Sequence, residues 1–224
     1  MDYALAQKNF RAKNVKYIPG LGVNLQQFQM RESNADLRSE LNLPTESKLI
    51  LSVGELNDNK NHSIIIKALA ELKDSNVYYL IAGNGPKKED LKFLAKEYGV
   101  ENNFYLLGYR RDLAYIYSNV DVFVLPSRRE GLGLAAIEAM SFGLPIVTSN
   151  RHGINDYSIE GKTGYKYDPN DYKGFASGIK KILEDPEMRQ SMSDHNRQFA
   201  KTFSIESSLQ AFEQIIVDIQ GASR

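Results

Sequence analysis

Two glutamates on either side of a glycine turn are the side chains of this sequence best suited to chemistry. Glu130 precedes the turn Gly131–Gly133, and Glu138 lies about one turn into a helix predicted over Leu134–Phe142. The glycines permit positive φ and close backbone approach, so the start of the helix can present free N–H groups to an anion. A rise of about 1.5 Å per residue places the two carboxylates roughly 10 Å apart. That span suits a nucleotide sugar.

The two carboxylates have different predicted surroundings. The helix that carries Glu138 is apolar nearly all round and is therefore expected to be buried, and a buried carboxylate is costly unless it is hydrogen-bonded. In one interpretation Glu138 accepts hydrogen bonds from vicinal ribose hydroxyls, as carboxylates do in dinucleotide-binding folds, and Glu130 contacts the sugar. In the other, Glu138 pairs with a core arginine and Glu130 only favours the helix dipole. The spacing leaves both open.

A lysine at the start of another predicted helix adds a positive charge. Lys60 follows a strand that ends at Gly54, and it stands just before the apolar helical pattern of residues 64–72. A lysine at a helix N-terminus opposes the dipole, and an anionic ligand there would offset that cost. Gly83 follows the next strand in the same way, although a glycine turn after a strand is common and is a weak sign of a site by itself. The alternative for Lys60 is a solvated side chain, which is usual for lysine.

Short apolar runs that alternate with helical patterns must position these residues. Such alternation predicts βαβ units and a parallel sheet, in which strands covered on both faces read as continuous apolar segments. We therefore expect an α/β fold, a Rossmann-like doubly wound sheet of about six strands followed by C-terminal helices. The predicted strands are Leu49–Val53, Val77–Ala82, Phe104–Leu107, Val120–Leu125, Pro145–Thr148 and Gly164–Tyr167.

The remainder of the chain divides around this sheet. Residues 1–14 are predicted to be a linker or the end of a helix from a missing N-terminal domain, residues 15–203 the Rossmann-like domain, and residues 204–224 a C-terminal helix that Ser204 caps. Between Gln26 and Ser47 we expect a loop with a short helix. The other predicted helices are Leu113–Ser118, with Asp112 as its N-cap, Phe175–Leu183 and Met188–Phe199.

Composition excludes several function classes. The chain has 28 lysines and arginines and 28 aspartates and glutamates, so no net charge favours binding to nucleic acid or to an anionic membrane. The chain has no cysteine, and its three histidines lie too far apart in sequence for a local metal motif. We expect His62 to be a cap or a surface residue and His195 to be structural or solvated. The polar N-terminus and the lack of a long apolar run indicate the cytoplasm.

The region around the two glutamates resembles a known family. E-G-L-G-L-A-A-I-E followed by A-M-S-F-G-L-P-I-V is similar to the E-x7-E signature and continuation of family 4 retaining glycosyltransferases. The resemblance runs from about Tyr17, in Y-I-P-G-L-G-V-N, to the C-terminal helix. It implies one half of a GT-B fold, the C-terminal half that binds most of the nucleotide-sugar donor. It also implies that a missing N-terminal domain binds the acceptor and makes any membrane contact.

The resemblance assigns a role to each candidate residue. Lys60 would hold the donor diphosphate with the N–H groups of Gly133 and Leu134, Glu138 would hold the ribose, and Glu130 would position the sugar. The expected substrate-binding residues are Glu138, Gly131, Leu132, Gly133, Leu134, Gly54, Gly83, Tyr109, Arg110 and His152. Tyr109 and Arg110 correspond to the nucleobase side, although Arg110 could equally be a surface cation.

Two positions depart from the family pattern. Glu55 stands where the family has an arginine that holds the diphosphate, so that role is not carried over. His152 stands in place of another arginine, and a loop histidine without a role is the alternative.

The implied reaction is transfer of a sugar from a nucleotide-sugar such as a UDP-sugar to a glycan or lipid-linked acceptor with retention. The resemblance implies that this transfer needs no cofactor or metal. Polysaccharide biosynthesis is the implied context. In isolation the chain is expected to be inactive. Two other interpretations compete: a non-catalytic nucleotide-sugar-binding module, and an unrelated doubly wound domain, such as a flavodoxin-like module, with structural glutamates.

Overall fold

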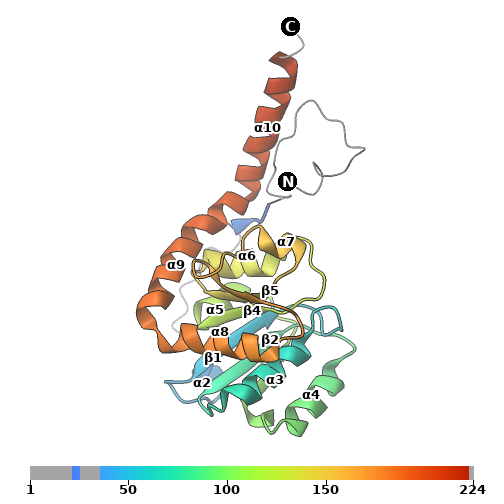
Figure 1. Cartoon of the computed structure of the whole chain (residues 1–224), viewed down its shortest axis with the longest axis vertical. Coiled ribbons are helices and arrows are strands. Elements are labelled where there is room, and N and C mark those ends of the chain that lie inside the picture. Colours follow the sequence, from blue (N-terminus) through green and yellow to red (C-terminus); the bar gives the residue numbers. More distant parts are fainter. Residues whose placement is uncertain (1–21, 26–35, 222–224) are drawn as a thin grey trace.

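A six-stranded parallel sheet forms the centre of the molecule (Figure 1). The computed structural model describes residues 22–25 and 36–221. Neighbouring strands of this sheet are parallel, which confirms the predicted fold class. The strands are β1 (Lys48–Val53), β2 (Val77–Ala82), β3 (Phe104–Gly108), β4 (Val122–Leu125), β5 (Ile146–Ser149) and β6 (Gly164–Tyr167).

The order of the strands locates the place where a ligand is expected. It is β3-β2-β1-β4-β5-β6, the order of dinucleotide-binding folds, and it differs from the flavodoxin-like order. The chain winds outward from β1 in one direction and from β4 in the other. The loops that leave the carboxyl ends of β1 and β4 therefore flank the switch point, where open α/β sheets bind their ligands.

Helices cover both faces of the sheet. Buried side chains of α3, α4 and α8 pack with one set of strand residues, and those of α5, α6 and α7 pack with the alternate set. The helices are α2 (Leu37–Glu40), α3 (His62–Leu72), α4 (Lys88–Glu97), α5 (Leu113–Ser118), α6 (Leu134–Ser141), α7 (His152–Asn155), α8 (Tyr172–Glu184), α9 (Pro186–Ala200) and α10 (Ile205–Gly221), with short 3₁₀ turns η2 (Glu101–Asn103) and η3 (Lys201–Phe203).

Two strand boundaries differ from the predicted ones for visible reasons. β4 begins at Val122 and not at Val120, because Asp121 turns its carboxylate toward the start of β1 and accepts hydrogen bonds from the Leu49 N–H and from Arg38. β5 begins one residue later than predicted, at Ile146, since Pro145 has no N–H to give to a strand ladder.

The C-terminal helix α10 begins where the sequence predicts. The Ser204 hydroxyl accepts a hydrogen bond from the Ser207 N–H at 3.1 Å, which confirms the cap. Val23 joins the base of this helix through backbone bonds to Phe203 and Ile205. Figure 1 shows α10 extending away from the sheet, and large apolar side chains along it, such as Phe212 and Ile219, are exposed. In the described part of the chain no helix has the length and apolar character to cross a membrane.

The expected short helix before β1 is α2. The predictions for residues 1–14 and for the extended segment around Tyr17 lie outside the described residues.

Candidate active site

The loops after β1 and β4 are joined by backbone and side-chain hydrogen bonds. The Asn59 carbonyl accepts from the Arg128 N–H at 2.8 Å, and the Asn59 amide both donates to the Arg129 carbonyl and accepts from the Arg129 N–H. The buried amide of Asn61 donates to the carbonyls of Pro126 and Pro169. Because these bonds cross between the two loops, the residues on either side of the switch point are held in one arrangement.

An ion pair lies between these loops. The Lys60 Nζ is 2.7 Å from the Glu130 Oε2, and the Ser127 hydroxyl donates to the same oxygen at 3.0 Å. The side chain of Lys60 is 24% exposed and that of Glu130 is 14% exposed. Ser127 is itself held, since its carbonyl accepts from the Ser149 hydroxyl at 2.6 Å. The two residues predicted to be catalytic therefore touch each other, at the place where the topology predicts a ligand.

Glycines bring backbone close to this ion pair. A Cβ on Gly54 would lie 3.3 Å from the Cε of Lys60, so the lysine stem packs over that glycine. A Cβ on Gly83 would collide with the Gly54 carbonyl oxygen, which leaves no room for a side chain. On the other loop, a Cβ on Gly153 would collide with the Gly131 carbonyl. Glycine is therefore required by contact at Gly83 and Gly153.

The turn before α6 presents the start of that helix beside Glu130. Gly133 caps α6 in the left-handed region, with φ of 68°, and no side chain caps the helix there. Leu132 is half-buried, whereas Leu134 is 50% exposed at the first helical position. A helix start without a side-chain cap has N–H groups available to an anion, as the sequence predicted.

Glu138 lies in the second turn of α6 and faces α5. Its Oε2 accepts a hydrogen bond from the Tyr117 hydroxyl at 3.0 Å. Burial raises the pKa of the Glu138 carboxyl, and the bond from Tyr117 partly opposes that rise. The predicted alternative of a core arginine partner is wrong, because the partner is a tyrosine. Glu130 is also more than a dipole-favouring charge, since it is ion-paired.

The predicted nucleobase residues lie after β3. Gly108 ends that strand, and its carbonyl accepts from the Gly83 N–H at 2.8 Å, so Tyr109 follows directly after a contact with the β2 loop. Tyr109 is 73% exposed. Arg110 is ion-paired with Glu40 at 2.7 Å and with Asp112 at 2.6 Å. Asp112 does stand at the start of α5, but its side chain makes no cap bond because Arg110 occupies it.

The prediction that His62 is a cap or surface residue is wrong. It is buried, and its ring nitrogens lie 3.1 Å from the Tyr79 hydroxyl and 3.2 Å from the Glu55 carbonyl. The pKa of His62 is lowered to about 4, chiefly by burial; the bond to the Glu55 carbonyl opposes this shift, and the nearby Lys60 charge adds to it. His62 thus fixes the backbone at Glu55, between Gly54 and Lys60.

The other two histidines differ from His62. His195 packs its ring against Phe199 with centroids 5.5 Å apart, which fits the predicted structural role. His152 is the first residue of α7, and its side chain lies outside what the structure describes.

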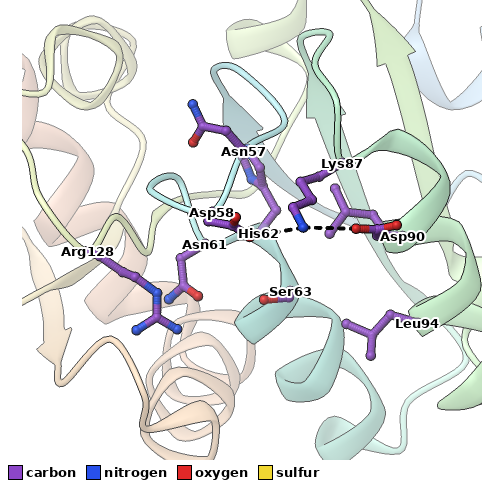
Figure 2. A pocket seen from close by; sticks show the side chains of 10 residues that line it. Asn57, Asp58, Asn61, His62, Ser63, Lys87, Asp90, Leu94 and Arg128 are labelled. Carbon is purple, nitrogen blue, oxygen red and sulfur yellow. Dashed lines mark hydrogen bonds and ion pairs between the residues drawn. The ribbon is translucent and has the colours of Figure 1, made fainter.

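A cavity of about 220 Å³ opens between the start of α3 and α4 (Figure 2). Lys87 extends toward Asp90 across it, and Arg128 lies at its other side. None of the residues that the sequence singled out as a site lines this cavity. Its lining residues are Asn57, Asp58, Asn61, His62, Ser63, Lys87, Asp90, Leu91, Leu94 and Arg128.

Sequence reasoning missed several residues that build the site. Ser127 and Asn59 have ordinary loop positions, and only the strand order brings their loops together. Tyr117 is 21 residues from Glu138 in sequence, so no local spacing could pair them. In the described residues no group of three histidine, aspartate or glutamate side chains is arranged to hold a metal ion.

The fold and site define a doubly wound α/β domain with an ion pair and an uncapped helix start at its switch point. The family described as "Glycosyl transferases group 1" matches residues 33–199, and the chain belongs to this family.

Curated relatives are similar in sequence but longer. An uncharacterized glycosyltransferase of Haemophilus influenzae is 32% identical over 174 residues, which are 76% of this chain and 49% of that protein. The lipopolysaccharide core biosynthesis glycosyltransferase LpsE of Rhizobium meliloti is 28% identical over 180 residues, 80% of this chain and 52% of the relative. The chain thus spans about half the length of the curated relatives it matches.

Solved structures share the fold. HepE of Anabaena, in complex with UDP, superposes with a TM-score of 0.80 at 21% identity, over 88% of this chain and 56% of that one. The C-terminal domain of a glycosyl transferase group 1 family protein, LpcC of Francisella tularensis, superposes with a TM-score of 0.70 at 19% identity, over 81% of this chain and 97% of that one.

Proposed function

We propose that this chain is the C-terminal, donor-binding half of a retaining glycosyltransferase with the GT-B fold. Residues 15–203 would bind the nucleotide sugar, and residues 204–224 would form a C-terminal helix beyond it. The observation that carries the proposal is the ion pair of Lys60 and Glu130, which lies at the switch point beside the start of α6. The chain superposes on 97% of the solved C-terminal domain of LpcC, and this match supports the assignment to a C-terminal domain.

The ion pair suggests how a donor would bind. Lys60 has three N–H donors, so it can turn from Glu130 toward a diphosphate. The first N–H groups of α6, at Gly133 and Leu134, would also attract the phosphates, because a helix N-terminus carries a partial positive charge. As the sugar bond breaks, these groups stabilise the negative charge on the departing diphosphate, as an oxyanion hole does. We expect this electrostatic role to need no metal ion.

The two glutamates would hold the two ends of the donor. Glu138 would accept hydrogen bonds from the ribose hydroxyls, and Tyr117 keeps its carboxylate oriented. Glu130 would position the sugar, with Ser127 fixing its carboxylate. In this proposal neither glutamate acts as a nucleophile, and the attacking hydroxyl comes from an acceptor bound by the other half of the enzyme.

The names of the relatives suggest the class of donor and acceptor. HepE was solved with UDP, and a relative from Escherichia coli, 28% identical over 54% of that protein, is named as a UDP-Gal-dependent galactosyltransferase acting on a diphosphoundecaprenol-linked sugar. We therefore propose a UDP-sugar donor and a glycan or lipid-linked acceptor in polysaccharide biosynthesis, at the inner face of the membrane.

Calorimetric titration with UDP, GDP and ADP tests the proposal. We expect one nucleotide to bind the wild-type chain, and Glu138→Ala to weaken that binding at least tenfold because ribose loses its acceptor. The matched control is Glu97→Ala on the exposed end of α4. Failure of all three nucleotides to bind would overturn the proposal. Binding without transfer in the complete protein would favour a non-catalytic module.

A further inference from the structure

A buried tyrosine hydroxyl near the site has no hydrogen-bond partner among the residues that the structure describes. The side chain of Tyr157 is fully buried, and its ring packs edge-on against Phe203 with centroids 6.0 Å apart. Its hydroxyl makes no hydrogen bond to any described residue. Buried polar groups almost always have a partner, and an unsatisfied one is costly. The edge-on contact of the ring with Phe203 gives the hydroxyl no partner.

The hydroxyl is directed at the turn that carries Glu130. A Cβ on Gly133 would collide with the Tyr157 Oη and lie 3.2 Å from the Glu130 Cγ, so both side chains flank the same glycine. Burial raises the pKa of Tyr157 above its usual range, and the negative charge of Glu130 raises it further. The Glu130 carboxylate therefore lies within the electrostatic reach of this hydroxyl.

The described partners of Glu130 use only one of its oxygens. Lys60 and Ser127 both bind Oε2, at 2.7 and 3.0 Å. An ionised carboxylate has about four acceptor positions on its two oxygens. If Lys60 turns toward a diphosphate, Glu130 keeps a single hydrogen bond, the one from Ser127, and its charge is less well compensated.

We propose that Tyr157 is a positioning residue whose hydroxyl donates to the Glu130 carboxylate when a donor diphosphate takes Lys60. This inference rests on the proposed function and deepens it. A phenol-to-carboxylate hydrogen bond is charge-assisted and short, so it would replace part of the interaction with Lys60. It would also hold Glu130 on the sugar side of the site, with the Tyr157 ring anchored in the core.

A single-atom change separates this role from packing. Tyr157→Phe keeps the ring and removes only the hydroxyl. The experiment measures thermal unfolding, and calorimetric binding of whichever of UDP, GDP and ADP binds the wild-type chain, for Tyr157→Phe, Glu130→Ala and the double variant. Tyr98→Phe on the far end of α4, where Lys67 stacks over the ring, is the matched control.

The expected results run in opposite directions. Tyr157→Phe should unfold at the same temperature as wild type or a higher one, because it removes an unsatisfied hydroxyl, yet bind the nucleotide about tenfold more weakly. In the Glu130→Ala background the same change should alter affinity less than twofold, since the acceptor is gone.

Three outcomes would overturn the inference. A markedly lower unfolding temperature for Tyr157→Phe would mean that the hydroxyl supports the fold itself. Unchanged nucleotide affinity, with wild-type binding intact, would reject the role of Tyr157 and leave the proposed function standing. If the wild-type chain binds none of the three nucleotides, the proposed function and this inference both fail.

Discussion

The two glutamates of the site are held in contrasting ways. Glu130 lies in a loop, where a lysine and a serine bind one of its oxygens. Glu138 lies in a helix, where burial raises the pKa of its carboxyl and the Tyr117 hydroxyl donates a hydrogen bond to it. The first carboxylate is stabilised by an opposite charge, whereas the second is partly desolvated without one. A lysine in an ion pair can exchange its carboxylate partner for an anionic ligand. A desolvated carboxylate is stabilised by any ligand that donates hydrogen bonds to it.

Acid should destabilise the protein by protonating His62, two residues after Lys60. Burial lowers the pKa of His62 to about 4 from 6.5, so the folded chain binds this proton less readily than the unfolded chain. The stability from neutral His62 is complete above pH 6.5 and is lost as pH falls toward 4, by about 3 kcal/mol in total. Urea unfolding at pH 7 and pH 4, compared with His62→Gln, measures it. Equal losses in both proteins would contradict the assignment.

Removing the lysine should abolish most nucleotide binding. Lys60→Ala takes away the charge proposed for the diphosphate and leaves Glu130 uncompensated beside it, so we expect affinity to fall about a hundredfold. Lys87→Ala, in the neighbouring cavity, is the control with a lysine that is also ion-paired. If the two variants bind alike in titration calorimetry, Lys60 does not contact the phosphates.

Neutralising each glutamate should change stability in opposite directions. Glu130→Gln leaves the partly buried Lys60 without its counter-charge and should cost about 1–2 kcal/mol. Glu138→Gln removes a desolvated charge and should stabilise the chain, while weakening nucleotide binding about tenfold. Chemical unfolding together with calorimetry gives both quantities. Destabilisation by both variants would show that the contrast between the glutamates is wrong.

The smallest expected effect is a gain in nucleotide affinity on changing Glu55. Glu55 is exposed, its carboxylate accepts a hydrogen bond from Asn57, and it occupies the place of the family's arginine. Glu55→Arg would replace a negative charge near the proposed diphosphate position with a positive one, and we expect affinity to rise about threefold, with a stronger dependence on salt. Glu55→Gln separates loss of the negative charge from gain of the positive one. A weaker-binding Glu55→Arg would indicate a different phosphate position.

Much of the fold follows from local patterns. Continuous apolar runs such as Val77–Ala82 can be buried only inside a covered sheet, so their type and extent are readable. Lys60, Glu130 and the glycines of both turns can be singled out as candidates from the sequence, because turn chemistry and charge at helix starts are local properties; their roles stay predictions. The ion pair between Lys60 and Glu130 was not, since it joins residues 70 positions apart.

The misread residues share one cause. His62 stands at a helix start, where a cap or a surface position is usual, and nothing local reveals that Tyr79 and the Glu55 carbonyl enclose it. In the same way Asp112 has the type and place of a cap, but Arg110 captures its carboxylate. In both cases another polar group binds the side chain: for His62 it comes from 17 residues away, and for Asp112 it is the nearby Arg110, which also pairs with the distant Glu40.

The glycine contacts also determine which positions of this chain could be varied in a redesign. A Cβ on Gly83 would collide with the Gly54 backbone, and one on Gly153 would collide with the Gly131 backbone, so a library that varies Gly83 and Gly153 would consist mostly of unfolded members. Tyr109 and Leu134 are exposed at the same end of the sheet. Diversity aimed at a new donor therefore belongs at those two positions, where the scaffold tolerates change.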